Sequence, residues 1–231
     1  MSGRLGVLGG TFDPIHYGHL DAADAARRAL RLDEVRLLPT HDPPHRRSSP
    51  LASAFHRFAL AALAANTDDG CTVSDLELRR AGPSYTIDTL QEIAAEGWRP
   101  WQIFFILGAD AFADIATWHR FPAVLDAANF AVIARPGTTL ETALAKVPEL
   151  RGRARDAASI DADAQGRTGV FLVEARTRDV ASTTIRARLS AGEPIDDLVP
   201  PSVARHIRAH HLYGAVDELH GQDTRRNSQN V

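Results

Sequence analysis

The sequence predicts an α/β fold built around a doubly wound parallel sheet. Short apolar segments alternate along the chain with segments whose apolar residues recur at helical spacing. The central apolar segments show no polar alternation, which is typical of strands covered on both faces. This alternation of strands and helices is the pattern of a parallel sheet with helices packed on it. With 231 residues, the chain is long enough for one large core.

The expected strands are apolar runs that end at glycine, proline or polar residues. They cover residues 5–8, 35–38, 72–78, 103–107, 130–134 and 170–173. The segment 103–107 is apolar throughout, so we expect it in the middle of the sheet.

The expected helices carry apolar stripes three and four residues apart. They cover residues 20–30, 55–63, 87–93, 182–191 and 201–209. Pro201 suits the first turn of the last of these helices. We see no linker that would divide the chain, so we expect one domain over residues 1–214 and a polar, disordered tail over residues 215–231.

Composition excludes several classes of protein. Lys and Arg number 26 against 29 Asp and Glu, a net charge of -3, so no basic field points to nucleic acid. Cys71 is the only cysteine, which excludes an internal disulfide and a cysteine-rich metal site. No apolar run approaches the roughly 20 residues of a membrane helix. Gly9, Gly10 and Asp13 interrupt the early apolar stretch, so we expect no signal peptide and a cytoplasmic protein.

Two common nucleotide-binding motifs are also excluded. Lys146 is the only lysine, and no glycine-rich loop precedes it, so the chain has no P-loop. The chain contains no GxGxxG, so the dinucleotide fingerprint is missing as well.

The loop after the first strand has the features of a phosphate site. Gly9 and Gly10 allow backbone N–H groups to approach a ligand closely. Gly18 and His19 begin a helix, whose N-terminus carries about half a positive charge and free N–H donors. His16 and His19 are three residues apart, so both imidazoles can face one phosphate chain. The alternative is a tight turn with two surface histidines.

A second segment near the C-terminus can also receive phosphate. Ser182 or Thr183 can cap the helix that begins there, leaving N–H groups and hydroxyls for phosphate oxygens. Arg186 supplies a permanently charged, forked donor one turn into the helix. Taken alone, this segment is also compatible with an ordinary helix cap.

These two segments resemble the signatures of a known enzyme superfamily. Residues 10–14 (GTFDP) and 16–19 (HYGH) resemble the HxGH motif of the nucleotidyltransferases. Residues 181–186 (ASTTIR) resemble the second marker of that superfamily, except that Ala181 stands where the superfamily usually has a serine.

The middle of the chain resembles one branch of this superfamily, the bacterial nicotinate mononucleotide adenylyltransferases. The similar segments are residues 82–90 (GPSYTIDTL), 108–112 (GADAF) followed by Trp118, 134–137 (ARPG) and, more loosely, 43–47 (PPHRR). The resemblance extends over residues 4–213 and implies a Rossmann-like nucleotidyltransferase fold.

The resemblance also implies substrates and site residues. The implied substrates are ATP and nicotinate mononucleotide, with Mg²⁺ held mainly by phosphates and water. Catalytic roles fall on His16, His19 and Arg186. The implied ATP contacts are Gly9, Gly10, Thr11, Phe12, Gly18, Gly108, Asp110, Ser182 and Thr183. The implied mononucleotide contacts are Asp13, His45, Arg46, Thr86, Ile87, Trp118, His119 and Arg135.

Several of these residues have a direct chemical interpretation. Trp118 can stack on a pyridine ring, although tryptophans also serve the core. Thr86 and the N–H groups of Ile87 and His119 can receive a pyridine carboxylate, and Thr86 can equally cap the following helix. Asp110 can meet ribose hydroxyls or a metal–phosphate cluster. Arg135 and the loop with His45 and Arg46 can contact phosphate, or belong to the solvated surface.

Three alternatives stay open. The acceptor can be nicotinamide mononucleotide or phosphopantetheine instead, because sequence discriminates acid from amide poorly. A non-catalytic nucleotide-binding module on the same fold is a third possibility. The sequence does not decide whether the chain forms a homo-oligomer.

Overall fold

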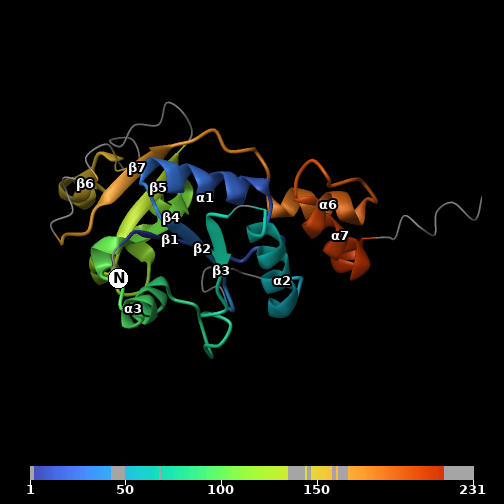
Figure 1. Cartoon of the computed structure of the whole chain (residues 1–231), viewed down its shortest axis with the longest axis horizontal. Coiled ribbons are helices and arrows are strands. Elements are labelled where there is room, and N and C mark those ends of the chain that lie inside the picture. The colour runs from blue at the N-terminus through green and yellow to red at the C-terminus, as the bar shows by residue number, and fades with distance from the viewer. Residues whose placement is uncertain are drawn as a thin grey trace, which may run out of the picture.

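The computed structural model describes residues 3–42, 50–67, 69–134, 144, 147–157, 160 and 166–215. Its centre is a seven-stranded sheet in the order β3-β2-β1-β4-β5-β7-β6 (Figure 1). Every pair of neighbouring strands is parallel. The predicted fold class, a doubly wound parallel sheet, is confirmed.

The elements have the following bounds. The strands are β1 (Leu5–Gly10), β2 (Glu34–Pro39), β3 (Cys71–Val73), β4 (Ile103–Gly108), β5 (Asn129–Ala134), β6 (Ala154–Arg155) and β7 (Val170–Glu174). The α-helices are α1 (Tyr17–Ala29), α2 (Ala54–Ala65), α3 (Thr86–Ala95), α4 (Ala109–Ala113), α6 (Ser182–Ser190) and α7 (Pro201–Ala209). Short 3₁₀ helices include η2 (Ile115–Thr117), η3 (Ala123–Asp126) and η6 (Leu212–Gly214). No helix among these described residues is long and apolar enough to cross a membrane.

The predicted strand over residues 72–78 is wrong beyond Val73. β3 pairs with β2 over three residues, and Ser74 donates the last ladder hydrogen bond to the Leu37 carbonyl (3.0 Å). The chain then turns, because the Asp75 carbonyl accepts hydrogen bonds from the N–H groups of Leu78 and Arg79. The apolar residues after Val73 therefore belong to a turn that reaches toward α3, and they do not continue the strand.

Side chains of the central strands alternate between two apolar clusters. Phe104 and Ile106 of β4 join the cluster that contains α1 and α2. Phe105 and Leu107 point to the opposite face and join α3, α4 and the 3₁₀ helices η2 and η3. Both faces of the sheet are thus covered, which explains why the central strands are apolar throughout.

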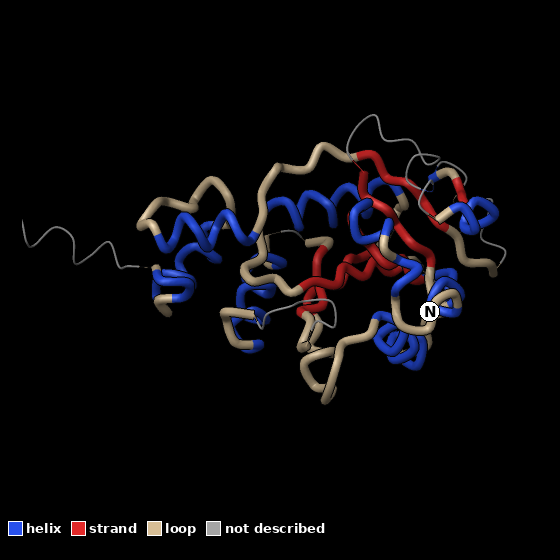
Figure 2. The backbone as a smooth tube through the Cα atoms, turned by 180° about the vertical axis from the view of Figure 1, so that it is seen from behind, coloured by secondary structure: helices blue, strands red, loops and turns tan. Residues whose placement is uncertain are grey.

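The C-terminal helices lie beyond the end of the sheet, beside α2 (Figures 1 and 2). The chain leaves β7, passes α1 and enters α6, so the segment 175–181 runs along the N-terminal half of α1. Arg178 fixes this segment by donating from Nε (3.0 Å) and Nη2 (2.7 Å) to the Asp21 carboxylate, and its guanidinium lies over the Tyr17 ring. Ala215 is buried in the apolar cluster that contains α1 and α2. Residues 216–231 of the predicted tail lie outside the described residues.

One arginine joins the ends of the first two strands. Arg57 of α2 is only 1% exposed, and its Nη1 donates to the carbonyls of Thr11 (2.8 Å) and Thr40 (2.6 Å). Thr11 follows β1 and Thr40 follows β2. Because one guanidinium nitrogen donates to both carbonyls, the arginine holds the two loops at a fixed separation.

We expect Arg57→Met to lower the free energy of unfolding by about 3 kcal/mol, because it leaves two part-buried carbonyls without their donor. Urea unfolding at pH 7 measures this. The matched control is Arg28→Met on α1, where the arginine is largely exposed and pairs only with Asp24 (2.9 Å). That change should stay within about 0.5 kcal/mol of the wild type. Equal losses in the two variants would contradict a supporting role for Arg57.

Candidate active site

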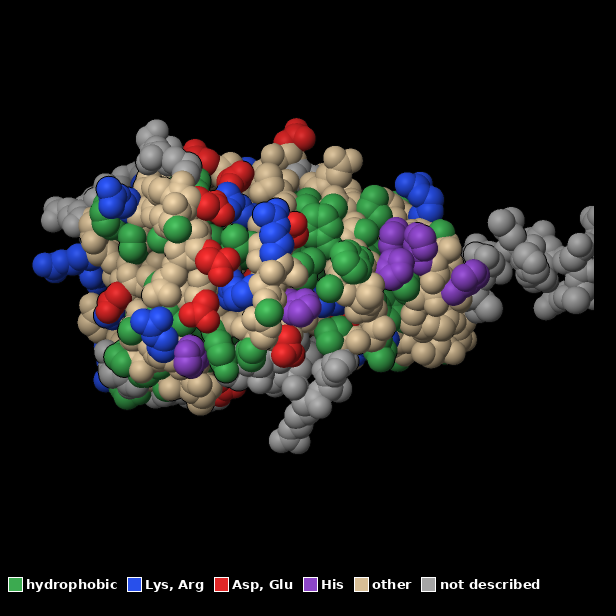
Figure 3. Space-filling view, turned by 90° about the horizontal axis from the view of Figure 1, so that it is seen from below, with side chains coloured by type: hydrophobic (Ala, Val, Ile, Leu, Met, Phe, Trp, Pro, Cys, Tyr) green, Lys and Arg blue, Asp and Glu red, His purple; other side chains and the backbone are tan. Residues whose placement is uncertain are grey.

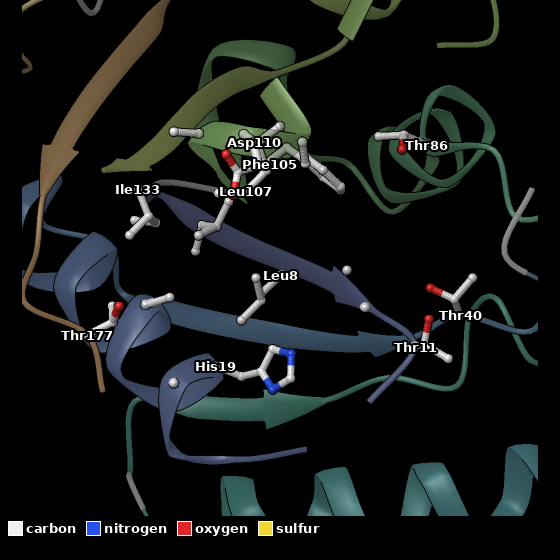
Figure 4. A pocket seen from close by; sticks show the side chains of 18 of the residues that line it. Leu8, Thr11, His19, Thr40, Thr86, Phe105, Leu107, Asp110, Ile133 and Thr177 are labelled. Atoms are coloured by element: carbon white, nitrogen blue, oxygen red, sulfur yellow. The ribbon is translucent and has the colours of Figure 1, made fainter. Parts of the chain in front are cut away.

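A cleft of about 780 Å³ opens at the carboxyl ends of the central strands (Figure 4). It lies between β1 and β4, where the strand order of the sheet changes direction. Open α/β sheets bind ligands at this point. Figure 4 shows His19 and Thr86 projecting from different helices around the cleft, with Asp110 beyond the end of β4.

Glycines at the strand ends shape the cleft in different ways. A Cβ on Gly108 would meet no protein atom within 4 Å, so the missing side chain leaves open space at the end of β4 for a ligand. A Cβ on Gly10 would lie 2.8 Å from the Phe12 ring. A Cβ on Gly18 would lie 3.1 Å from the Arg178 carbonyl and 3.2 Å from the His16 ring. Gly18 therefore allows the segment after β7 to pack on the start of α1.

Two histidines are stacked at the N-terminus of α1. His16 is the N-cap residue, and its N–H donates to Nδ1 of His19 (3.3 Å). The two rings lie 3.7 Å apart, centroid to centroid, at 30°. Since Nδ1 of His19 accepts this hydrogen bond, its Nε2 carries the ring proton and is a donor. Both histidines line the cleft, together with Gly18 in the first turn of α1.

Burial controls the charge of this pair. His16 is 6% exposed, and burial lowers its pKa to about 4, although Asp21 acts in the opposite direction. Burial also places the pKa of His19 well below its ordinary value, and the neighbouring His16 lowers it further. Both imidazoles are therefore neutral at pH 7 in this arrangement. A bound polyanion would raise both values by its opposite charge.

Arg186 lies beside the cleft and is tied to the loop after β1. Its Nη1 donates to the Asp13 carbonyl (2.7 Å) and lies 4.0 Å from the Asp13 carboxylate. Ser182, at the first position of α6, donates from Oγ to the Pro14 carbonyl (2.9 Å). The first turn of α6 is thereby fixed next to the N-terminus of α1.

The opposite wall of the cleft is aromatic and begins a helix. The rings of Tyr85 and His119 are stacked at 4.1 Å and 25°. Trp118 stands edge-on to Phe105 at 5.8 Å and 89°. α3 starts at Thr86, and the N–H groups of its first turn include donors without a partner inside the helix. This wall offers a flat apolar surface next to hydrogen-bond donors.

Comparisons with known proteins agree with this geometry. The family described as cytidylyltransferase-like matches residues 7–188. The probable nicotinate-nucleotide adenylyltransferase of Aeromonas hydrophila is 42% identical over 90% of this chain and 96% of its own length. The protein of the same description from Pseudomonas aeruginosa strain PAO1 is 41% identical over 93% of this chain and 99% of its own. The chain belongs to the nicotinate-nucleotide adenylyltransferase family.

Solved structures support the fold of this family member. The nicotinic acid mononucleotide adenylyltransferase of Plasmodium falciparum complexed with NaAD has a TM-score of 0.66 at 20% identity. It covers 91% of this chain and 97% of its own. A second structure of that protein, complexed with APC, has a TM-score of 0.65 at 19% identity, with the same coverage of both chains.

The structure brings most of the predicted site residues of this adenylyltransferase family member into one cleft. Those that line it are Gly9, Gly10, Thr11, His16, Gly18, His19, Thr86, Gly108, Asp110, Trp118 and His119. Ile87, Thr183 and Arg186 lie outside the cleft lining. His45, Arg46 and Arg135 lie outside the described residues.

The side chains of three predicted site residues contact other parts of the protein. The predicted mononucleotide contact Asp13 is 1% exposed, and its carboxylate accepts from the N–H groups of Leu51 and Ala52 and from the hydroxyl of Tyr213. Its oxygens are thus occupied by the protein itself.

The side chain of Phe12, predicted to contact ATP, is buried edge-on against His19 at 5.1 Å. Neither Ser182 nor Thr183 is the N-cap of α6, because that residue is Ala181. The Ser182 hydroxyl instead donates to the Pro14 carbonyl.

Several residues in the cleft were missed by sequence reasoning. They are Thr40, Glu77, Ser84, Tyr85, Thr177, Arg178 and Asp179. Ser84 and Tyr85 belong to a segment that the sequence singled out, so their proximity to Thr86 was available as a signal. Glu77 carried no signal, because it lay in the predicted strand that proved to be a turn.

Histidines outside the cleft gather on one surface near α7 (Figure 3). Nδ1 of His56 and Nε2 of His206 are 3.1 Å apart, and the ring of His210 lies 4.3 Å from that of His206. No group of three His, Cys, Asp or Glu residues in the described part of the chain is arranged to hold a metal ion.

The buried histidine pair predicts acid sensitivity. The folded-state pKa of His16, about 4, is below the ordinary histidine value of 6.5. Between these two pH values the unfolded chain therefore binds a proton that the folded chain does not. Stability therefore falls as pH falls through this window, and His16 contributes a loss of about 2 kcal/mol between pH 7 and pH 5.

Asn is a good N-cap and does not titrate, so His16→Asn should remove this part of the loss. Urea unfolding at pH 7 and pH 5 measures the difference, and the exposed His41→Asn serves as the control that should keep the wild-type loss. An undiminished loss in His16→Asn would show that His16 is not the group responsible.

Proposed function

We propose that the chain transfers AMP from ATP to nicotinate mononucleotide, forming deamido-NAD and pyrophosphate. The observation that carries this proposal is that one cleft has two chemically different ends, one polar and one aromatic. The stacked His16 and His19 at the N-terminus of α1 form a polar, phosphate-binding end. Thr86 at the N-terminus of α3, with the aromatic wall beside it, forms an end suited to a flat ring that bears an anion. The names of the relatives support the same pair of substrates.

The ATP end is built from the first turn of α1 and the end of β4. The adenosine approaches over Gly108, where a side chain would otherwise fill the space. Asp110, which follows β4 and lines the cleft, is placed to meet ribose hydroxyls or the phosphate cluster. The triphosphate lies toward His16 and His19, whose neutral rings donate hydrogen bonds and gain charge as the anion raises their pKa.

The mononucleotide end is built from the start of α3 and the segment 118–119. The pyridine ring packs against Trp118, whose edge-on contact with Phe105 fixes its orientation. The pyridine carboxylate accepts from Thr86 and the N–H groups near the start of α3, where the helix dipole favours an anion.

Catalysis rests on alignment and charge stabilisation. The acceptor phosphate is already an anion at pH 7, so it attacks the α-phosphorus of ATP without a general base. The bond between the acceptor oxygen and the α-phosphorus forms as the bond to pyrophosphate breaks. Holding the three atoms in line supplies much of the acceleration. His16, His19 and Arg186 stabilise the charge on the α-phosphate and on the leaving pyrophosphate.

Arg186 can serve this role while keeping its present contact. Only Nη1 is used by the Asp13 carbonyl, so the rest of the guanidinium fork is available to a phosphate.

A divalent cation, which we infer to be Mg²⁺, enters with ATP and is held mainly by phosphate oxygens and water. The described residues fit this arrangement, because Asp110 is a carboxylate that faces the cleft. When bound, Mg²⁺ neutralises charge on the phosphates. The protein residues position the two substrates around it.

The test is pyrophosphate release from Mg-ATP with nicotinate mononucleotide, nicotinamide mononucleotide and phosphopantetheine in parallel. We expect fast release with nicotinate mononucleotide and slower release with the amide. Release with phosphopantetheine alone would identify a different acceptor. Binding of ATP without release in any of the three reactions would indicate a non-catalytic module.

We expect His19→Ala to lower kcat by about 100-fold, because it removes a hydrogen-bond donor that acts in the transition state. The control is His210→Ala, at an exposed histidine outside the cleft, which should leave kcat unchanged. Steady-state kinetics of the folded variants measure both. An unchanged kcat in His19→Ala would remove His19 from the mechanism.

We expect Trp118→Ala to raise the KM for nicotinate mononucleotide by about 10-fold, because it removes the stacking surface for the pyridine ring. The KM for ATP should change much less. Trp101→Ala, at a partly exposed tryptophan outside the cleft, is the control. A similar rise in both KM values would mean that Trp118 only supports the core.

A further inference from the structure

Glu77 is a buried acid in the wall of the cleft that the mechanism above does not use. It is 5% exposed and lies in the turn that follows β3. It is on the side of the cleft formed by Ser84, Tyr85 and Thr86, which also line the cavity. A carboxyl group buried to this degree is costly unless its hydrogen-bonding capacity is used, so its contacts indicate its role.

The first contact joins Glu77 to α3. The Thr89 hydroxyl, fully buried in α3, donates to Oε1 of Glu77 (2.8 Å). Arg80 donates from Nη2 to the same hydroxyl (3.0 Å), and its Nε lies 2.8 Å from Oε1 of Glu92. The turn after β3 and the first turns of α3 are therefore held together around Glu77.

Two further segments, at the end of β2 and before α3, lie near Glu77. Thr40 and Ser84 line the cleft beside it, and its second carboxyl oxygen, Oε2, is buried and accepts no hydrogen bond from the described residues. The Ser84 hydroxyl accepts from the His41 N–H (3.2 Å), and the Ser84 N–H donates to the Asp42 carbonyl (2.9 Å). Glu77 is thus hydrogen-bonded to α3 through Oε1 and lies near the hydroxyls of two other segments.

Burial raises the pKa of Glu77, while the surrounding hydroxyls and Arg80 act in the opposite direction. The balance favours the uncharged carboxyl more than in water.

We propose that Glu77 is a positioning residue for the pyridine end of the mononucleotide. By accepting from Thr89, it ties the turn after β3 to the first turns of α3, and so places the first N–H groups of α3 and the Tyr85–His119 stack. It acts through these neighbours and has no contact with the reacting phosphates. The inference rests on the proposed function, because the ligand of this end of the cleft is taken to be nicotinate mononucleotide.

The test compares Glu77→Ala with Glu77→Gln. The amide of Gln can still accept from Thr89, whereas Ala removes this link. We expect Glu77→Ala to raise the KM for nicotinate mononucleotide about 10-fold, with the KM for ATP and kcat within about twofold, and Glu77→Gln to stay within about twofold throughout. Steady-state kinetics with each substrate varied separately provide these values.

Two further variants keep the test decisive. Glu92→Ala removes the outer partner of Arg80 on the same helix, and it should leave both KM values within about twofold of the wild type. If Glu77→Ala does not fold, Thr89→Val replaces it, because Val keeps the shape of Thr and removes the hydroxyl that donates to Glu77. Thr89→Val should then raise the KM for the mononucleotide alone.

Three results would overturn the inference. Unchanged KM values in Glu77→Ala, or in Thr89→Val when the first variant does not fold, would show that this end of the cleft does not need this link. An equal rise in both KM values would show a general loss of structure. A Glu77→Gln variant as impaired as Glu77→Ala would show that hydrogen bonding by an uncharged group is not the role. A wild-type protein that does not turn over nicotinate mononucleotide would instead overturn the proposed function itself.

Discussion

The arrangement of the phosphate-binding end depends on the buried carboxylate of Asp13. This side chain accepts hydrogen bonds from the N–H groups of Leu51 (2.9 Å) and Ala52 (3.0 Å) and from the hydroxyl of Tyr213 (2.8 Å). Arg186 lies 4.0 Å from the same carboxylate. A buried carboxylate needs this many partners, and they come from three separate parts of the chain. Asp13 therefore fixes four elements relative to one another. They are the loop after β1, the segment before α2, α6 and the C-terminal 3₁₀ helix.

The chemistry of the cleft follows from this fixed position. The loop that Asp13 anchors also contains His16, so the packing that buries the loop also buries the imidazole and lowers its pKa. Arg186 is brought to the same place by a contact with the backbone of Asp13. The helix N-terminus, two uncharged imidazoles and one permanent cation thus form a site that gains charge when an anion binds. Such a site avoids the repulsion that several neighbouring cations would experience before the anion binds.

The opposite wall uses a second buried carboxyl in a different environment. Glu77 accepts from the Thr89 hydroxyl, whereas Asp13 accepts from two backbone N–H groups and the Tyr213 hydroxyl and lies near Arg186. The two ends of the cleft are thus each organised around a buried acid that connects segments distant in sequence. Their surroundings suit their ligands: the end for the triphosphate has cationic and N–H donors, and the end for the pyridine has hydroxyls, aromatic rings and a helix N-terminus.

The amino-acid sequence predicts the parallel sheet, nearly all of its strands and helices, and the cleft residues His16 and His19, and the family resemblance adds Thr86. These depend on local patterns: apolar periodicity, glycines after strands and residues at helix starts. Only the tertiary structure decided that Asp13 is an internal anchor, that Ser182 binds the Pro14 carbonyl, and that Glu77 lies in the cleft wall. The partners of Asp13 and Ser182 lie up to 200 residues away along the chain, and no local pattern records such contacts. Glu77 meets its partners only because β3 ends after three residues, and the short pairing of an edge strand is decided by its neighbour in the sheet.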